Sequence, residues 1–185
     1  MNTFPVVECE FSPEANLVEF LFSPADVSGL VKQKAKELAI NIIESLDMVG
    51  ILAVEFFLTK DGSLLINEIA PRPHNSGHHT IESNVTSQFQ QHLRSVLNLP
   101  LGDTSLTSCG AMLNILGEKD SNGPALYDGL EFLLDHPGVF VHIYGKEIVK
   151  SYRKMGHVTV TAPTVDELKQ KIQSIKGKLK AHSAK

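Results

Sequence analysis

Apolar positions near the start of the chain follow first a strand pattern and then a helical one. Two β-rich runs within residues 5–22 flank a turn-like stretch at 12–16, which predicts a hairpin with a longer loop. Over residues 28–47 apolar side chains recur every three or four positions, the repeat of an amphipathic helix. We therefore expect the chain to open with a hairpin followed by one helix.

The strongest local signal is the dipeptide Asp61-Gly62 between apolar runs at residues 51–58 and 63–69. Asp-Gly in this position is typical of a tight hairpin turn. Residues 71–79, PRPHNSGHH, contain two prolines and a glycine, so they cannot form regular structure. The pattern predicts a second hairpin followed by a polar working loop.

Two carboxylates face each other across this second hairpin if the dipeptide alone forms its loop. Glu55 then lies opposite Glu68, and Phe57 opposite Ile66. Because the neighbours on both faces are apolar, we expect a covered sheet, where opposed like charges call for a cation between them. Oxygen ligands suit Mg²⁺, which predicts a magnesium site. The alternative is that one glutamate turns to solvent or pairs with Arg72.

Phe57 lies on the same strand face as Glu55, two residues away. A nucleotide base stacked on its ring would direct the phosphates toward the carboxylates, although a plain core phenylalanine is the alternative. The sequence contains neither GxxxxGK[ST] nor GxGxxG. A bound nucleotide would therefore use neither a P-loop nor a Rossmann turn.

The PRPHNSGHH loop concentrates hydrogen-bond donors. Arg72, His74, Asn75, His78 and His79 supply a guanidinium, imidazoles and an amide, which suit a small oxyanion such as bicarbonate or phosphate. The alternative is zinc held by the three histidines. The loop lacks the helical presentation of HExxH and offers no thiolate, which disfavours zinc.

The remaining pattern predicts shorter elements. They are a helix at 83–97, a strand at 110–116, a helix at 125–134, strands at 139–144 and 157–161, and a last helix capped by Thr164. Arg153 and Lys154 lie in a turn-like stretch before His157. Such a pair can hold a phosphate, but basic turns usually face solvent.

The composition is that of an ordinary globular chain. Of 185 residues, 42 % are hydrophobic and 21 % charged, which argues against disordered and collagen-like classes. The net charge is −4, so nucleic acid is not an expected partner. No apolar run or leader pattern indicates a membrane or export, and we expect a cytoplasmic protein. Cys9 and Cys109 lie far apart and are expected to be reduced core residues.

Residues 50–104, from GILAVEFF through PRPHNSGHHT to LPLGDT, resemble the carboxyaminoimidazole ribonucleotide synthetases of purine biosynthesis. These enzymes are also called ATPase subunits of phosphoribosylaminoimidazole carboxylase. Weaker likeness extends from FPVVE to RKMGH, whereas the hairpin alone would indicate only the ATP-grasp superfamily. The related formate-dependent glycinamide ribonucleotide transformylases resemble the chain up to PRPH, and the continuation NSGHHT favours the carboxylating family.

The resemblance implies an enzyme that uses ATP and Mg²⁺ to activate bicarbonate as carboxyphosphate. The carboxyl group then passes to the amine of aminoimidazole ribonucleotide. It implies these residue roles: Glu55 and Glu68 as magnesium ligands; Arg72, His74 and Asn75 at the bicarbonate and aminoimidazole end; Arg153 and Lys154 at the ribonucleotide phosphate. It also implies a homodimer.

These observations together predict an α+β chain. Residues 1–104 are expected to form the C-terminal part of an ATP-grasp fold, and residues 105–185 a small β-rich lobe with a terminal helix. Members of the resembled family are longer, and their other half would carry the substrate-binding N-terminal domain, the ATP lid with its lysine, and the adenine hinge. This chain alone is therefore expected not to hydrolyse ATP at a useful rate. The alternatives are a truncated, non-catalytic ATP-grasp module and the formate-dependent transformylase.

Overall fold

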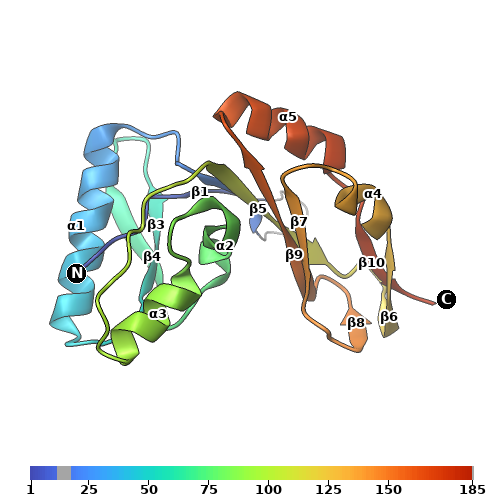
Figure 1. Cartoon of the computed structure of the whole chain (residues 1–185), viewed down its shortest axis with the longest axis horizontal. Coiled ribbons are helices and arrows are strands. Elements are labelled where there is room, and N and C mark those ends of the chain that lie inside the picture. The colour runs from blue at the N-terminus through green and yellow to red at the C-terminus, as the bar shows by residue number, and fades with distance from the viewer. Residues whose placement is uncertain (12–17, 185) are drawn as a thin grey trace. The chain divides into compact units, whose positions relative to one another are not determined.

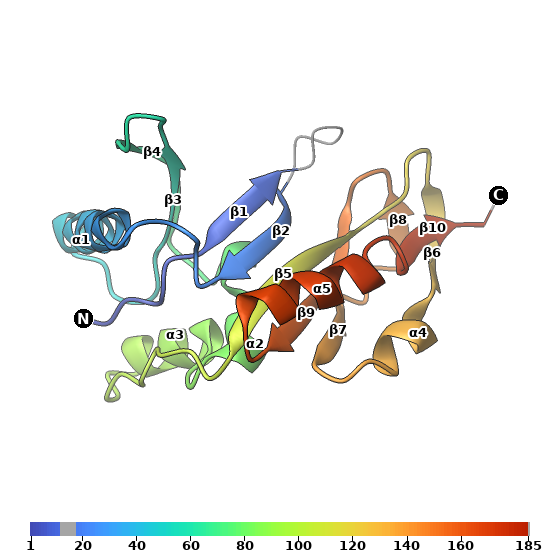
Figure 2. The ribbon, with the colours of Figure 1, turned by 90° about the horizontal axis from the view of Figure 1, so that it is seen from above.

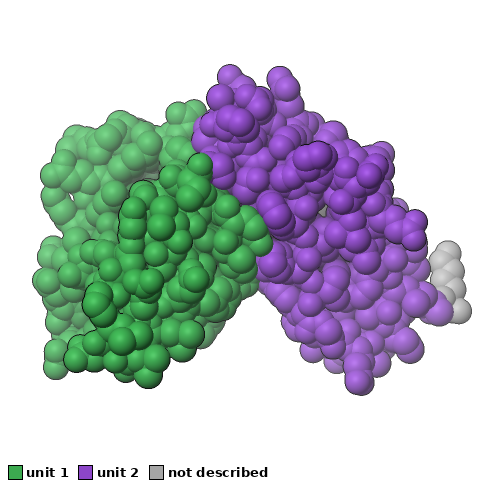
Figure 3. All heavy atoms as spheres, in the orientation of Figure 1, with its two compact units in different colours: residues 1–8, 23–107 green, residues 9–22, 108–185 purple. Residues whose placement is uncertain are grey.

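The computed structural model of the chain describes residues 1–11 and 18–184. It contains two compact units, coloured separately in Figure 3. Unit 1 comprises residues 1–8 and 23–107, and unit 2 comprises residues 9–22 and 108–185. Helices and antiparallel strands are mixed along the chain, so the predicted α+β class is confirmed. The division into domains at residues 104 and 105 stays a prediction.

Unit 1 is built on a helix and a hairpin that contact each other (Figure 1). The predicted helix is α1 (Gly29–Ser45), which begins where the Ser28 hydroxyl accepts a hydrogen bond from the Val31 N–H. The predicted hairpin consists of β3 (Ala53–Leu58) and β4 (Leu64–Ala70). The polar loop follows directly after β4.

The region after the polar loop differs from the single helix predicted at 83–97. It contains the short helix α2 (Thr80–Ser83) and then α3 (Gln88–Val96). The loop itself holds one 3₁₀ turn, η1 (Asn75–Gly77), so the expectation that it has no regular structure is wrong for these three residues. The helix begins at Gln88 because Ser87 and Gln90 form a capping box. Asn84, inside the predicted helix, instead forms a β-bridge with Leu106.

Unit 2 contains most of the strands, in a five-stranded sheet of order β1-β2-β5-β9-β7 and a three-stranded sheet of order β10-β6-β8. The helix α5 contacts β5 and β9 (Figure 2). The bounds are β1 (Glu8–Phe11), β2 (Val18–Ser23), β5 (Cys109–Leu116), β6 (Asn122–Asp128), α4 (Leu130–Leu134), β7 (Val139–Ile143), β8 (Ile148–Lys150), β9 (Lys154–Ala162), α5 (Val165–Ile175) and β10 (Lys180–Ser183). The first predicted hairpin is confirmed as neighbouring strands β1 and β2, and its turn lies outside the described residues.

The helix predicted at 125–134 is wrong over its first half. Residues up to Asp128 belong to β6, whose side chains alternate between exposed and partly buried and which pairs with β8 and β10. Gly129, with φ of 84°, then turns the chain into the short α4. The prediction failed because the apolar spacing of ALYDGLEFLL fits a helical repeat, while long-range pairing decides the strand.

The apolar core lies in unit 2. α5 begins after Thr164, as predicted, where the Thr164 hydroxyl accepts a hydrogen bond from the Glu167 N–H, and the helix buries Leu168, Ile172 and Ile175. These side chains pack with Leu133 of α4 and with buried residues of the sheets, which are Phe20, Ala111, Ile115, Val139, Val149, Met155, Val158, Val160, Ala162 and Ala181. Cys9 and Cys109 are free thiols and only partly buried. Among the described residues, no helix is long and apolar enough to cross a membrane.

Candidate functional site

The hairpin loop is one residue longer than predicted. The Thr59 N–H donates to the Ser63 carbonyl, so three residues form the loop, and Gly62 takes the left-handed conformation with φ of 83°. Phe57 therefore pairs with Leu65, and the predicted pairing of Phe57 with Ile66 is wrong. The Thr59 and Ser63 hydroxyls donate to Asp61, which lowers the pKa of that carboxyl.

A β-bulge restores the predicted register farther along the hairpin. The pairing shifts between Glu55 and Phe56, so that Asn67 becomes the extra residue on β4. Glu55 and Glu68 are direct partners, as predicted, although the two shifts that produce this pairing were not foreseen. Both glutamates lie on the face that also carries Phe57.

The hairpin is less covered than the sequence predicted. Phe57 is 52 % exposed and its partner Leu65 is 55 % exposed on the face of the two glutamates. Ile66, on the other face, is 54 % exposed. The expectation of a sheet covered on both sides is wrong for the described residues, because the hairpin forms a sheet of two strands only. Phe57 is therefore not a core side chain, and its ring is accessible beside the carboxylates.

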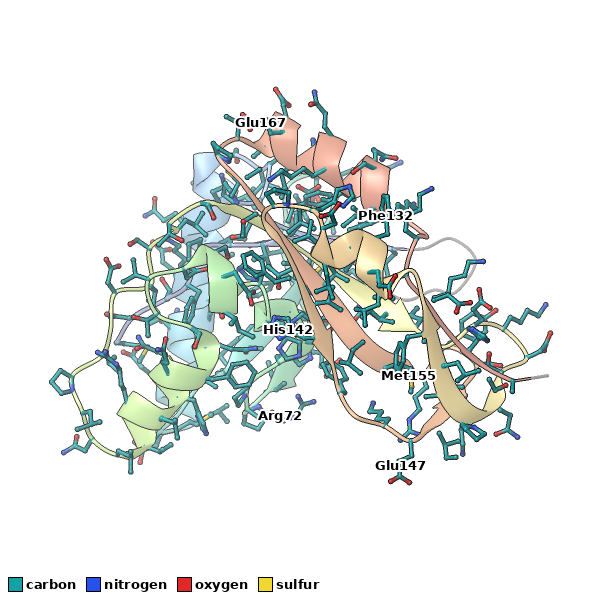
Figure 4. All side chains as sticks on the ribbon, turned by 45° about the vertical axis from the view of Figure 1, so that its right-hand side comes forward. Arg72, Phe132, His142, Glu147, Met155 and Glu167 are labelled. Atoms are coloured by element: carbon teal, nitrogen blue, oxygen red, sulfur yellow. The ribbon has the colours of Figure 1, made fainter. Side chains whose placement is uncertain are left out.

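His74 connects the hairpin with the polar loop. Its Nδ1 lies 3.7 Å from Glu55 Oε1 and 2.9 Å from the Ser76 hydroxyl. Only 13 % of the His74 side chain and 25 % of the Glu55 side chain are exposed. The Arg72 guanidinium instead donates to the Pro73 carbonyl, and the Arg72 side chain projects from the ribbon (Figure 4). The neighbour that the structure gives Glu55 is thus His74 rather than Arg72.

The two carboxylates fit Mg²⁺ that is shared with phosphates. Mg²⁺ usually takes one or two carboxylates and completes its octahedron with water and phosphate oxygens. Glu55 is half-buried and Glu68 exposed on one face, which leaves such positions accessible. In the part of the chain that the structure describes, no group of three or more His, Cys, Asp or Glu side chains could hold a metal ion.

The zinc alternative does not fit the histidines. His74 Nδ1 contacts Ser76, and His78 Nδ1 lies 2.9 Å from the Gln88 amide. His79 Nδ1 lies 3.1 Å from the Ser76 carbonyl, so it carries the proton. The three rings therefore hold separate partners instead of converging. His79 is almost fully buried, and burial lowers its pKa to about 4, which keeps it neutral.

Sequence reasoning missed two residues that contact predicted site residues. In unit 1, Gln88 is buried and bonds to both His74 and His78, as described below. In unit 2, the Lys146 ammonium donates to the Lys154 carbonyl. Burial lowers the pKa of Lys146, and the charges of Arg153 and Lys154 lower it further. Lys146, Arg153 and Lys154 thus form a cluster of three cations in unit 2. In retrospect, the two short basic stretches YGK and RK are the sequence signal for it.

Arg153 and Lys154 differ in their backbone setting. Lys154 is the first residue of β9, so the predicted strand at 157–161 begins three residues earlier. Arg153 lies in the turn before it, and its guanidinium donates to the Ile148 carbonyl. Tyr152 has φ of 59°, which places the turn in the left-handed region. The cluster belongs to unit 2, whereas the PRPHNSGHH loop belongs to unit 1.

Two family models match the chain. An ATP-grasp domain matches residues 1–89, and a phosphoribosylaminoimidazole carboxylase C-terminal domain matches residues 110–171. The chain is 44 % identical over 172 residues to the N5-carboxyaminoimidazole ribonucleotide synthase of Bacillus subtilis, covering 93 % of this chain and 43 % of that protein. It is 42 % identical to the phosphoribosylaminoimidazole carboxylase of Saccharomyces cerevisiae, covering 95 % of this chain and 31 % of that protein. The chain thus spans less than half the length of these curated relatives.

Solved structures show the same relationship in three dimensions. The N5-carboxyaminoimidazole ribonucleotide synthetase of Thermotoga maritima superposes with a TM-score of 0.88 at 44 % identity, over 98 % of this chain and 48 % of that one. The synthase of Aspergillus clavatus in complex with ADP and 5-aminoimidazole ribonucleotide gives a TM-score of 0.83 at 39 % identity. That match covers 93 % of this chain and 46 % of the Aspergillus chain.

Proposed function

Because this chain belongs to the N5-carboxyaminoimidazole ribonucleotide synthetase family of ATP-grasp proteins, we propose that it supplies part of the active site of a purine-biosynthetic ligase. The ligase carboxylates 5-aminoimidazole ribonucleotide with bicarbonate and converts ATP to ADP and phosphate. A bicarbonate oxygen takes the γ-phosphoryl group to give carboxyphosphate. The ribonucleotide amine then bonds to the carboxyl carbon, phosphate leaves, and the amine loses a proton.

The contact between Glu55 and His74 carries this proposal. It joins the carboxylate pair, which suits a metal–phosphate complex, to the loop that suits a small oxyanion. A reaction that transfers phosphoryl to bicarbonate needs these two functions side by side. The relative solved with ADP and aminoimidazole ribonucleotide supports the same pair of ligands.

The site residues take the following proposed roles. Glu55 and Glu68 hold Mg²⁺, which when bound neutralises phosphate charge. Phe57 contacts the nucleotide from the same face. Arg72, His74 and Asn75 bind bicarbonate and orient the amine, because their N–H groups can donate to oxyanions. Arg153 and Lys154 bind the ribonucleotide phosphate, and the nearby Lys146 adds positive charge.

We also propose that the intact enzyme is cytoplasmic and a homodimer, which rests on the family likeness. Sedimentation of the intact enzyme tests the second point. A monomer at assay concentration would contradict it.

A chimaera tests the function directly. Residues 1–185 replace the matching segment of the Bacillus subtilis synthase. We expect ADP formation that requires both aminoimidazole ribonucleotide and bicarbonate, and His74→Ala should lower kcat about 10²-fold or more. Gln33→Ala, on the exposed side of α1, is the control and should leave kcat unchanged. A folded chimaera that makes ADP equally without the ribonucleotide, or that prefers formate and glycinamide ribonucleotide, contradicts the proposal.

Arg153→Ala in this chimaera separates binding from chemistry. The phosphate is bound alike in the ground and transition states, so the substitution should raise KM for aminoimidazole ribonucleotide about tenfold and leave KM for ATP nearly unchanged. An equal rise in both KM values would remove Arg153 from the phosphate site.

A further inference from the structure

Gln88, the first residue of α3, holds the loop on which the site residues lie. The residue is only 3 % exposed. Its Oε1 accepts a hydrogen bond from the His74 N–H at 2.9 Å, and its Nε2 donates to the His74 carbonyl at 2.9 Å. One amide thus binds both backbone polar groups of His74, as a neighbouring β-strand would.

The same amide determines where His78 carries its proton. A backbone N–H can only donate, so Oε1 must face His74 and the orientation of the Gln88 amide is fixed. The second Nε2 hydrogen then donates to His78 Nδ1 at 2.9 Å. His78 Nδ1 is therefore an acceptor, and the neutral ring carries its proton on Nε2. Phe89, the next residue of α3, stacks on the His78 ring at 5.8 Å between centroids.

Two further contacts, at Gly77 and Thr80, hold the loop against Gln88. A Cβ added at Gly77 would lie 2.7 Å from Gln88 Cδ, so a side chain at Gly77 would displace the amide. The Gln88 N–H, which has no partner within its own helix, donates to the Thr80 hydroxyl at 2.9 Å. The Thr80 hydroxyl in turn donates to the Gly77 carbonyl at 2.6 Å. These bonds tie both ends of the 74–80 segment to the start of α3.

We propose that Gln88 is a positioning residue of the ligase site: it fixes the His74 backbone and holds His78 as the Nε2–H tautomer. This inference rests on the proposed function for its catalytic meaning. His78 then directs an N–H donor away from Gln88, and an N–H donor suits the oxygens of bicarbonate or carboxyphosphate. A ring protonated on Nδ1 alone would present a lone pair there and repel the same oxygens.

The chain offers a matched control on the same helix. Gln91 is 6 % exposed and binds the backbone of Gly102 in the same way: its Oε1 accepts from the Gly102 N–H at 2.8 Å, and its Nε2 donates to the Gly102 carbonyl at 3.2 Å. Both of these side-chain bonds go to Gly102 and not to the 74–80 segment. The same substitution at either glutamine therefore removes a matching pair of backbone hydrogen bonds, and only the substitution at Gln88 also removes a bond to His78.

The closing experiment reads the tautomer in the full chain, independently of activity. Long-range ¹H–¹⁵N spectra of labelled protein, with His78 assigned through His78→Gln, should show Nδ1 unprotonated and Nε2 protonated. Gln88→Glu replaces the donor by an acceptor and should move a proton to His78 Nδ1. Gln88→Met, of similar shape, should leave His78 as a mixture of tautomers. It should also speed hydrogen exchange of the His74 backbone amide roughly tenfold. Gln91→Met should speed exchange at Gly102 instead and leave His78 unchanged.

The outcomes separate this inference from the proposed function. If His78 keeps its tautomer in Gln88→Met, or changes equally in Gln91→Met, the positioning role is refuted whatever the chimaera does. If the tautomer responds as expected, kcat of the active chimaera should fall about 10²-fold in Gln88→Glu with KM for ATP unchanged. An unchanged kcat there would refute the catalytic meaning of the tautomer. A chimaera without ribonucleotide dependence would refute the proposed function and leave the tautomer result standing.

Discussion

The two units of this chain differ in the kind of side chain that they mostly bury. Unit 2 packs aliphatic and aromatic residues from its sheets and α5 into one apolar cluster. Unit 1 buries polar side chains, namely Ser23, His79, Thr80, Ser83, Asn84, Thr86, Ser87, Gln88 and Gln91. Its apolar side chains are often exposed, as Phe57 and Leu93 are. Hydrophobic packing is non-directional, whereas hydrogen bonds fix the orientation of particular groups. The contrast indicates that unit 2 has a stabilising core and that unit 1 uses its interior to orient a loop.

The largest effect should come from truncating the apolar core. Leu168 is fully buried in unit 2, and Leu168→Ala should lower the free energy of unfolding by about 2–5 kcal/mol through lost burial and a cavity. Leu93→Ala, at a leucine that is 57 % exposed in unit 1, should change it by less than about 0.5 kcal/mol. Urea unfolding followed by tyrosine fluorescence measures the first, because all three tyrosines lie in unit 2. Circular dichroism follows the second. An equal loss of unfolding free energy in Leu168→Ala and Leu93→Ala would contradict this difference between the two units.

The polar interior should make unit 1 sensitive to acid. Burial lowers the pKa of His79 from 6.5 to about 4, so the unfolded chain binds the proton first as the pH falls. The free energy of unfolding is therefore unaffected by this group above about pH 6.5. It falls by about 3 kcal/mol between pH 6.5 and 4. Denaturant midpoints across this pH range measure the loss. His79→Gln cannot titrate at this position and should therefore make the denaturant midpoint less dependent on pH. An unchanged pH dependence would show that another group is responsible.

A smaller effect should follow from removing one hydroxyl of the polar interior. Thr80→Val deprives the Gln88 N–H of its acceptor in a buried position, which should cost about 1–3 kcal/mol. Thr107→Val, at an exposed threonine of the same unit, is the matched control and should be nearly neutral. Thermal unfolding monitored by circular dichroism compares the two. If both variants melt like the parent chain, the hydrogen bonds of unit 1 do not stabilise the loop.

The smallest effect concerns the glutamate pair. Glu68→Gln removes the repulsion between directly opposed carboxylates, which should raise the free energy of unfolding by about 0.2–1 kcal/mol in the absence of Mg²⁺. Lys60→Gln, in the exposed loop of the same hairpin, serves as the control for a changed charge. Chemical denaturation in EDTA provides the measurement. Destabilisation by Glu68→Gln would mean that Glu68 makes a favourable contact in the metal-free chain.

The predictable parts of the structure are those that depend on local patterns. The hairpin turn, α1 and the buried face of α5 follow from turn chemistry, periodicity and capping. The opposition of Glu55 and Glu68 was also predicted, but a longer loop and a bulge at Asn67 compensate for each other, and neither leaves a clear sequence signal. The predicted pairing thus held for a reason that the sequence did not reveal.

The unpredictable parts depend on contacts between distant residues. β6 reads as helix because its apolar spacing fits a helical repeat, and only its pairing with β8 and β10 makes it a strand. Gln88 looks like an ordinary polar residue of a helix, yet it is buried against His74, fourteen positions away. The likeness to a known family supplied candidate residues in both units, but only the structure revealed Gln88 as the residue that holds the loop.

The most direct test of the account is a titration of the ¹⁵N-labelled chain with aminoimidazole ribonucleotide and, separately, with ribose 5-phosphate. Arg153 and Lys154 are the residues proposed to bind the ribonucleotide phosphate, and Arg72, His74 and Asn75 those proposed to orient the amine. The ribonucleotide should therefore shift the amide signals of residues 72–79 and 153–154, whereas ribose 5-phosphate should shift only residues 153–154. If saturating ribonucleotide leaves both segments unchanged, or if ribose 5-phosphate shifts the loop instead, the proposed assignment of the site is contradicted.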